Sequence, residues 1–289
     1  MLLRRALVCL VGATKRSSFS IRHLSSSDIS SGVTIPGDLP QPPTFATKEE
    51  EREDRKKKLA ASFRIFKHYG FDEGAAGHIT ARDPIEPDTF WVNGFGLDFG
   101  EVTVSNLIRV DAAGKVVEGK YPVNQAAFSI HSRIHEARPD VIAAAHSHSI
   151  HGRAFSTLGK LLDPYTQDSC AFWNDHALYD DYGGVAFEMD EGQAIANALG
   201  DKKAAILMNH GLLTTGATVD ECVWWYITME KCCRVELLLK DYQGRSPSMI
   251  KSEDAIKQAN AIVGSKFAGW FQYQGLYRKM IKDQPDCLL

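Results

Sequence analysis

The sequence of 289 residues lacks the features that mark two large classes of protein. Its longest apolar run, from Ala6 to Ala13, is far shorter than the roughly 20 residues that a membrane-spanning helix requires. Its net charge is −3 with histidine neutral, so it has no excess of positive charge for nucleic acid or an acidic membrane surface. We therefore expect a globular protein that binds a small molecule and neither nucleic acid nor a membrane.

The six cysteines include no CxxC pair, and two of them, Cys232 and Cys233, are adjacent. A disulfide framework would need a different spacing. We expect reduced cysteines that pack as small hydrophobic residues, as in proteins of a reducing compartment.

Acidic residues are absent from the N-terminus until Asp28, whereas residues 1–23 contain five arginines and lysines and several serines. This composition is typical of a mitochondrial transit peptide, which we predict over residues 1–24. The mature protein is then expected in the mitochondrial matrix, and the alternative is a cytoplasmic protein with a disordered tail. Residues 25–46 are rich in serine and proline and are interpreted as a linker.

The hydrophobic pattern of residues 47–245 changes repeatedly between the period of a helix and the alternation of a strand. It predicts helices at 48–70, 124–137, 192–199 and 220–240, and strands at 78–82, 89–92, 107–117 (a hairpin), 141–145 and 204–208. A C-terminal extension, 246–289, contains one more helical segment at 252–280. Helices alternating with strands predict an α/β fold for residues 47–245.

Three histidines stand at the predicted ends of two apolar strands. His146 and His148 follow the strand 141–145, and residues two apart in extended chain project to the same side. His210 follows the strand 204–208. If the two strand ends meet, three imidazoles can hold one ion and leave coordination positions open for a substrate. The alternative is that these histidines only hydrogen-bond nearby carbonyl groups.

Other histidines have simpler interpretations. His131 and His135 are four residues apart on one face of a predicted helix, and without a third ligand they are expected to pack or to support the site from behind.

Four segments together resemble the class II aldolase/adducin family, and its adducin-like branch in particular. They are residues 123–132 (VNQAAFSIHS), 137–141 (ARPDV), 146–148 (HSH) and 209–213 (NHGLL), which occur in the family's order and separation. The resemblance covers most of residues 47–245. It implies a three-layer α/β/α domain around a mainly antiparallel sheet.

The resemblance also implies a metal centre and an assembly. The family's aldolases hold one zinc ion with three histidines, which match His146, His148 and His210. Zinc is the first expectation for this chain, with iron or manganese as alternatives. The aldolases are homotetramers with active sites between subunits, so a homotetramer is expected here.

The substrate-binding positions of the aldolases are only partly preserved. Gly77 and His78 lie where those enzymes have a Gly-Asn phosphate loop, and Asn93 and Gly94 lie where they have a Thr-Gly pair. With Asn124, these residues are the expected substrate-binding positions. Because His78 replaces an asparagine and Asn93 a threonine, phosphate is not the expected substrate group.

The carboxylate that the aldolases use for proton transfer is missing. The matching position, four residues before His131, is Ala127, and residues 119–135 contain no acid. Aldol cleavage needs a group that moves a proton. Within the polar run 175–184, Tyr179, Tyr182 and His176 are the candidates to replace it.

Three functions follow from these observations. The first is a metal-dependent lyase that cleaves or decarboxylates a small hydroxy-carbonyl compound through an enediolate, and that is not an ordinary sugar-phosphate aldolase. The second is an adducin-like, non-catalytic protein of the actin cytoskeleton, although residues 246–289 lack an adducin's basic cluster. The third is a non-haem iron oxygenase.

Overall fold

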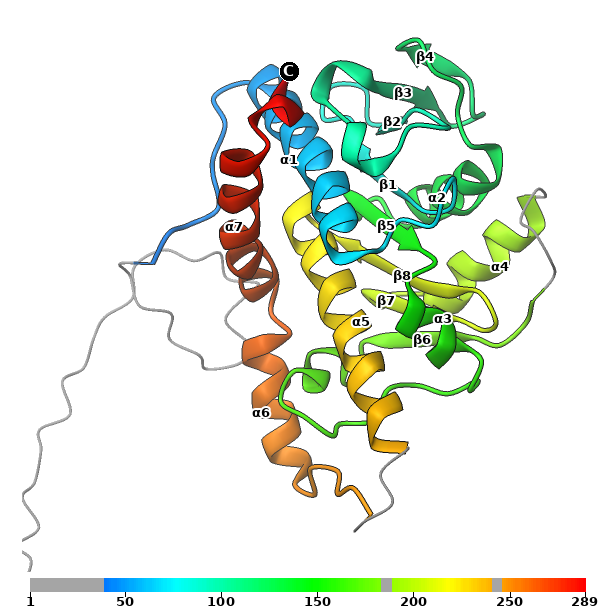
Figure 1. Cartoon of the computed structure of the whole chain (residues 1–289), viewed down its shortest axis with the longest axis vertical. Coiled ribbons are helices and arrows are strands. Elements are labelled where there is room, and N and C mark those ends of the chain that lie inside the picture. Colours follow the sequence, from blue (N-terminus) through cyan, green and yellow to red (C-terminus); the bar gives the residue numbers. More distant parts are fainter. Residues whose placement is uncertain (1–38, 183–188, 241–245) are drawn as a thin grey trace, which may run out of the picture. The chain divides into compact units, whose positions relative to one another are not determined.

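Eight strands form one sheet in the computed structural model of the protein, which describes residues 39–182, 189–240 and 246–289 (Figure 1). The strand order is β4-β3-β2-β1-β5-β8-β7-β6, and every neighbouring pair is antiparallel except the parallel pair β6–β7. The strands are β1 (His78–Arg82), β2 (Thr89–Asn93), β3 (Leu107–Asp111), β4 (Val116–Glu118), β5 (Ala143–Ser147), β6 (His176–Tyr179), β7 (Ala204–Leu207) and β8 (Gly211–Gly216). The predicted mainly antiparallel α/β fold is confirmed.

Seven α-helices are found in the described residues, with four short 3-10 helices between them. The α-helices are α1 (Lys48–Tyr69), α2 (Gln125–Ala137), α3 (Ile150–Ser156), α4 (Met189–Leu199), α5 (Val219–Lys240), α6 (Glu253–Val263) and α7 (Lys266–Asp283). The predicted transit peptide, residues 1–24, and the linker up to residue 38 lie outside the described residues.

Local sequence signals fix the two ends of α1. The side chain of Thr47 accepts a hydrogen bond from the backbone N–H of Glu50 at the first turn. Gly70 ends the helix in the left-handed conformation, with φ 70°, which glycine adopts without a steric penalty. The buried stripe of α1 includes Leu59, Phe63 and Phe66.

The alternation of side chains along the strands divides the interior into two faces. One face, called here the α5 face, is covered by α1 and α5 and contains Trp91, Trp225 and Phe172 in one large apolar cluster. The other, called the α2 face, is covered by α2 and α4 and has two smaller apolar clusters. In β1, Ile79 belongs to the α5 face and its neighbour Thr80 to the α2 face.

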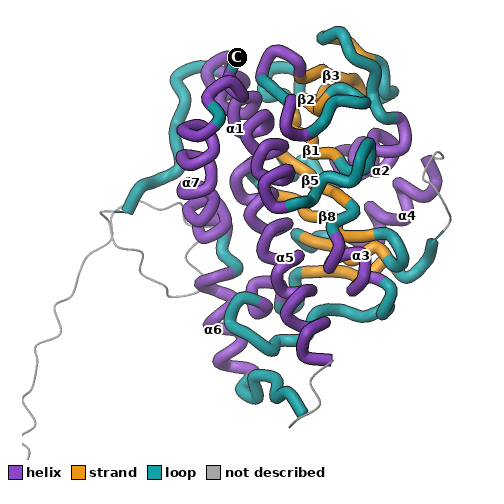
Figure 2. Tube along the Cα trace, in the orientation of Figure 1, coloured by secondary structure: helices purple, strands orange, loops and turns teal. Residues whose placement is uncertain are grey.

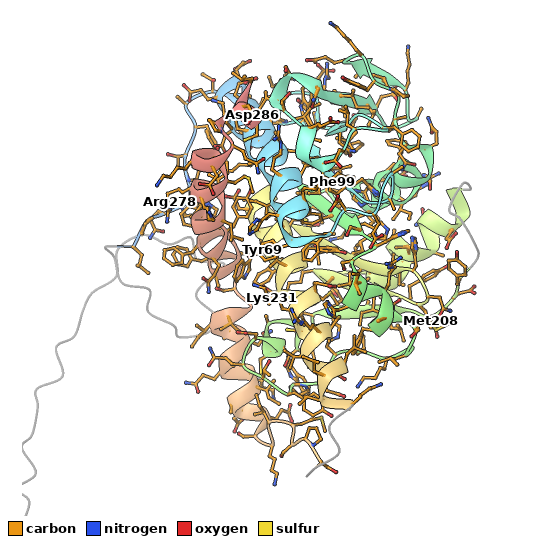
Figure 3. All side chains as sticks on the ribbon, in the orientation of Figure 1. Tyr69, Phe99, Met208, Lys231, Arg278 and Asp286 are labelled. Carbon is orange, nitrogen blue, oxygen red and sulfur yellow. The ribbon has the colours of Figure 1, made fainter. Side chains whose placement is uncertain are left out.

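The C-terminal helices complete the α5 side, where α1, α5 and α7 run side by side (Figure 2). Residue Arg64 of α1 donates to Asp286, which follows α7, at 2.8 Å. The ammonium group of Lys231 lies 5.2 Å from the centre of the Tyr69 ring, and Figure 3 labels Tyr69, Lys231 and Asp286. Residues 246–289 therefore pack directly on the helices that cover the sheet.

The structure differs from the predicted elements in three ways: a strand is longer, some elements were not predicted, and one predicted helix is two. Strand β5 continues to Ser147, because its pairing with β8 extends through His146 opposite Leu213. Strands β6 and β8 and helix α3 were not predicted. The segment 252–280 is two helices, because the side chain of Ser265 caps a new helix by accepting from the backbone N–H of Ala268.

The five cysteines in the described residues are reduced and buried, as predicted. Across the described ranges, no helix combines the length and apolarity that crossing a bilayer would require.

Candidate functional site

The site is built where β5 ends and β8 begins. These neighbouring strands are antiparallel, so His146, near the end of β5, lies beside the start of β8. His210 lies in the tight turn between β7 and β8, two residues after Met208, which Figure 3 labels. Asn209 makes this turn with φ 59°, a left-handed conformation that asparagine tolerates better than most residues.

The three predicted histidines come together at this point. The ring centres of His146 and His148 are 5.2 Å apart, those of His146 and His210 are 4.7 Å apart, and those of His148 and His210 are 4.9 Å apart. One nitrogen from each ring lies within 4.8 Å of the other two. This spacing suits a single divalent ion held by three imidazoles.

Hydrogen bonding orients one of these rings for coordination. The Nδ1–H of His146 donates to the carbonyl oxygen of Leu212 at 2.8 Å, because a carbonyl can only accept. The lone pair of His146 is therefore on Nε2, as in metal sites whose ligating histidine is held by a backbone carbonyl. The donor set fits a bound ion.

The charge state of the three histidine rings also suits a bound metal ion. Burial, followed by the neighbouring His210, holds the pKa of His146 well below its usual value. Burial and then His148 lower the pKa of His210 to about 4. Burial lowers the pKa of His148 as well. At neutral pH all three rings are neutral, which is the form that binds a metal ion.

Two glycines let the backbones approach closely behind the histidines. A Cβ atom on Gly211 would lie 2.8 Å from the carbonyl oxygen of Ser147 and 3.6 Å from Cε1 of His146. A Cβ atom on Gly77 would lie 2.9 Å from Cβ of Ser147, and Gly77 has φ 93°. Both positions therefore exclude larger residues at the base of the site.

Two residues of α5, not identified from the sequence, hold the segment that carries His148. The hydroxyl of Tyr226 donates to the carbonyl oxygen of Ser147 at 2.8 Å. The carboxylate of Glu230 accepts from Ser149 Oγ at 2.6 Å and from the N–H of Gly152 at 2.6 Å. The available signal was the acid Glu230 four residues after Tyr226 in the predicted helix, because an acid that becomes buried needs hydrogen-bond partners.

A row of polar side chains continues from the site along the α2 face. His78 of β1 is directly opposite His146 of β5, and their ring centres are 5.4 Å apart. The ring of His131 lies 3.9 Å from that of His78. The hydroxyl of Thr80 then lies 2.8 Å from both His131 Nδ1 and His135 Nε2. The sequence identified His78 as a substrate-binding position and His131 and His135 as packing or supporting residues, but it gave no sign of Thr80.

The other predicted substrate positions lie at the same end of the sheet. Strand β2 runs antiparallel to β1, so its last residue Asn93 and the following Gly94 are near the start of β1 at His78. The amide of Asn124 donates to the carbonyl oxygen of Ala75 at 3.4 Å, shortly before Gly77. These residues surround the approach to His78.

The three candidates for the missing acid have different positions. The ring centre of Tyr182 lies 6.3 Å from that of His210, and 47% of Tyr182 is exposed. Tyr179 ends β6 and packs on the α2 face. Residues 183–184 of the same run lie outside the described residues.

The prediction of His176 as a catalytic residue is wrong. Its strand neighbour Leu178 belongs to the α5 face, and residues two apart in a strand share a face. Its Nδ1–H donates to the carbonyl oxygen of Phe172 at 2.6 Å, and its Nε2 accepts from the N–H of Leu162 at 2.9 Å. Both nitrogens are therefore used, on the side of the sheet away from His146.

Comparison with known proteins agrees with this geometry. The sequence model of the family described as "Class II Aldolase and Adducin N-terminal domain" matches residues 57–237. The chain belongs to this family. Ala127, the position at which the resemblance implies a missing carboxylate, lies in α2.

Two curated proteins and one solved structure are similar to most of the chain. Decarboxylase NovR of Streptomyces niveus is 43% identical over 88% of this chain and 94% of its own length. A protein of Streptomyces roseochromogenus subsp. oscitans named 4-hydroxy-3-prenylphenylpyruvate oxygenase/4-hydroxy-3-prenylbenzoate synthase is 42% identical over 88% of this chain and 92% of its own length. The solved structure of L-fuculose 1-phosphate aldolase from Glaciozyma antarctica PI12 has a TM-score of 0.80 and 45% identity, covering 86% of this chain and 97% of that one. These matches support the prediction of a lyase-type enzyme.

Proposed function

We propose that this protein is a metal-dependent lyase that breaks a C–C bond in a small hydroxy- or oxo-carbonyl compound. The observation that carries the proposal is the convergence of His146, His148 and His210, with the lone pair of His146 Nε2 directed away from the Leu212 carbonyl. The three residues would hold one divalent ion, zinc in the first instance. When bound, such an ion polarises a substrate carbonyl and stabilises the negative charge that develops as the C–C bond breaks.

The chain's own residues would orient the substrate and surround its reacting group. Three neutral imidazoles leave the net charge of the ion in place, which favours an anionic substrate group. Tyr182 is the candidate proton donor whose ring lies beside His210. The residues Gly77, His78, Asn93, Gly94 and Asn124 would form the wall that contacts the substrate.

The names of two of the three relatives support a carboxylate-bearing substrate, whereas the third is named for a sugar phosphate. One relative is named a decarboxylase, and another is named for a phenylpyruvate. In this chain a histidine, His78, stands where the family's aldolases have a phosphate-binding asparagine. A 2-oxo acid or hydroxy acid is therefore a better candidate than a sugar phosphate.

A second candidate is a non-haem iron oxygenase, which is favoured by the oxygenase name of one relative. Imidazole ligands suit iron or manganese as well as zinc. The adducin-like, non-catalytic function is favoured by the adducin-like match at residues 124–131 and by the missing carboxylate at Ala127. The three candidates differ in metal content and in their need for oxygen.

The deciding experiment measures metal per chain on protein purified without chelator or affinity tag. The variant His146→Ala/His210→Ala is the test, and His68→Ala, which removes an exposed histidine of α1, is the matched control. We expect about one equivalent of metal in the wild type and the control and none in the variant.

Turnover is then followed with 4-hydroxyphenylpyruvate, hydroxypyruvate and L-fuculose 1-phosphate, in air and without oxygen. Cleavage without oxygen supports the lyase, and cleavage only in air supports the oxygenase. A well-folded wild type that contains no metal and takes none up would remove both enzymatic proposals and leave the adducin-like function.

The assembly and the location are also proposed. The family resemblance supports a homotetramer, which sedimentation of the purified chain tests. The composition of residues 1–24 supports import into the mitochondrial matrix. Determination of the N-terminal residue of the protein isolated from its cells tests this, and a retained Met1 in the cytoplasm would contradict it.

A further inference from the structure

The polar row on the α2 face has a fixed hydrogen-bond direction that begins at His135. The Nδ1 of His135 lies 3.3 Å from the carbonyl oxygen of Val141, which can only accept. Burial and then the nearby Arg82 lower the pKa of His135 to about 3, so the ring is neutral at physiological pH. A neutral imidazole with its proton on Nδ1 has a lone pair on Nε2.

This direction passes through Thr80 to His131. The Thr80 hydroxyl has one proton, which it must donate to His135 Nε2 at 2.8 Å. It therefore accepts its other hydrogen bond, also 2.8 Å long, from Nδ1–H of His131. Burial and then His135 hold the pKa of His131 well below its usual value. The His131 ring is neutral as well, so its Nε2 must be an acceptor.

Two buried nitrogen atoms in this row have no hydrogen-bond partner: Nε2 of His131 and Nε2 of His78. Both rings are at least 97% buried, with relative exposures of 1% and 3%, and their centres are only 3.9 Å apart. An unsatisfied buried polar atom costs about 1–3 kcal/mol. Because His131 Nε2 can only accept and the two rings are in contact, a proton on His78 Nε2 is the arrangement in which the two atoms can serve as each other's partner.

The other nitrogen of His78, Nδ1, then carries a lone pair, and the ring lies beside the metal site. His78 is opposite His146 in the sheet, and both His148 and His210 act electrostatically on it. A lone pair on this wall attracts a hydroxyl group and repels a phosphate oxygen.

We propose that His135, Thr80 and His131 are positioning residues that fix His78 as a hydrogen-bond acceptor, and that the site therefore selects a substrate with a hydroxyl group next to its carbonyl. This inference rests on the lyase function proposed above and adds the substrate feature that the wall recognises. It also gives a physical reason for the histidine in place of the phosphate-binding asparagine.

The first test measures the tautomers by 15N NMR of histidine-labelled protein, with His78 and His131 assigned from His78→Gln and His131→Gln variants. We expect a protonated Nε2 on His78 and an unprotonated Nε2 on His131. The variant Thr80→Ser keeps the hydroxyl and should keep this pattern. Thr80→Val has a similar shape but no hydroxyl, and should lose the pattern. An Nδ1-protonated His78 in the wild type would overturn the proposal.

The second test compares the binding of hydroxypyruvate and pyruvate, which differ by one hydroxyl group, to the zinc-loaded protein by calorimetry. We expect hydroxypyruvate to bind about tenfold tighter to the wild type and to Thr80→Ser, and this preference to fall below about threefold in Thr80→Val. A wild type that shows no preference for hydroxypyruvate, including one that binds neither compound, overturns the selection.

Metal content is measured in every sample. Loss of metal from the wild type would be a failure of the proposed lyase. A metal-loaded wild type without the tautomer pattern would be a failure of this inference alone.

Discussion

The two faces of the sheet use histidine in opposite ways. On the α5 face, His176 satisfies both ring nitrogens with backbone groups and lies in the large apolar cluster around Phe172 and Trp225. On the α2 face, the Nε2 atoms of His78 and His131 have no backbone partner, and the row ends at three neutral rings around one point. The first face therefore uses histidine to satisfy backbone groups in the apolar core, and the second gathers polar rings around the candidate metal site.

The sharpest test of this comparison replaces one histidine of the candidate metal site and one histidine of the α5 face with alanine. His148→Ala should lower metal affinity by more than about 100-fold, since a direct ligand matters more than the supporting residues that cost 10–100-fold. It should change the stability of the metal-free protein little. His176→Ala should leave metal affinity unchanged and lower the free energy of unfolding by about 2–4 kcal/mol, because two buried backbone groups lose their partner.

Chelator competition and urea unfolding of the metal-free protein measure the two effects. If His176→Ala lost metal, or His148→Ala lost stability without losing metal, the division between the faces would be wrong.

Truncation of a large buried side chain tests the α5 face alone. Trp225 is fully buried, its Nε1–H donates to Glu221 at 3.2 Å, and Lys203 lies 4.2 Å from its ring centre. Trp225→Ala should lower the free energy of unfolding by about 3–5 kcal/mol. Metal affinity should stay within about threefold of the wild type, because the hydrogen bonds from α5 to the segment that carries His148 are made by Tyr226 and Glu230, which the variant keeps. Urea unfolding followed by circular dichroism checks the first value.

The sequence predicted two members of the triad from a local signal, whereas the third, His210, depended on two strand ends meeting. His146 and His148 are adjacent to an apolar strand, and a histidine two residues after another shares its side of the chain. The family resemblance added the fold. Strand β8 was not predicted, since glycines stand at both ends of its six residues, Gly211 to Gly216. Its pairing with β5 and β7 on both sides makes it a strand, and pairing is not visible in a short segment.

The polar row could not be predicted for a related reason. Thr80 is 51 residues from His131 and 55 from His135, and only the pairing of β1 with β5 brings it below α2. His176 was predicted at the site but lies on the α5 face, because the alternation of side chains along β6 decides which face each residue occupies. One residue of register separates the two faces of a strand.

The pH dependence of stability sharpens the comparison further. Because the pKa of His135 falls from an unfolded value near 6.5 to about 3, only the unfolded chain takes up a proton between these pH values. This ring therefore makes no pH-dependent contribution above pH 6.5, and stability is lost as the pH falls from 6.5 toward 3. At pH 5 the loss is about 2 kcal/mol for this one residue.

His135→Phe keeps a ring that can stack on Phe90, whose ring centre lies 4.4 Å from that of His135. The variant should reduce the slope of unfolding free energy against pH by about 1.4 kcal/mol per pH unit between pH 6 and 4. Urea unfolding of the metal-free protein at several pH values measures the slope. An unchanged slope would mean that His135 is protonated in the folded protein, and the fixed direction of the polar row would fail with it.

The smallest effect is expected at the exposed rim of the site. Tyr182→Phe keeps the ring beside His210 and removes only the hydroxyl of a residue that is 47% exposed. If this hydroxyl only orients the substrate, kcat/KM should fall about fivefold, which corresponds to one hydrogen bond of about 1 kcal/mol. A proton donor contributes about 10²–10⁴-fold to the rate, so a loss in that range would identify Tyr182 as the replacement for the missing carboxylate. Tyr179→Phe tests the other tyrosine candidate in the same way, because Tyr179 ends β6 on the α2 face.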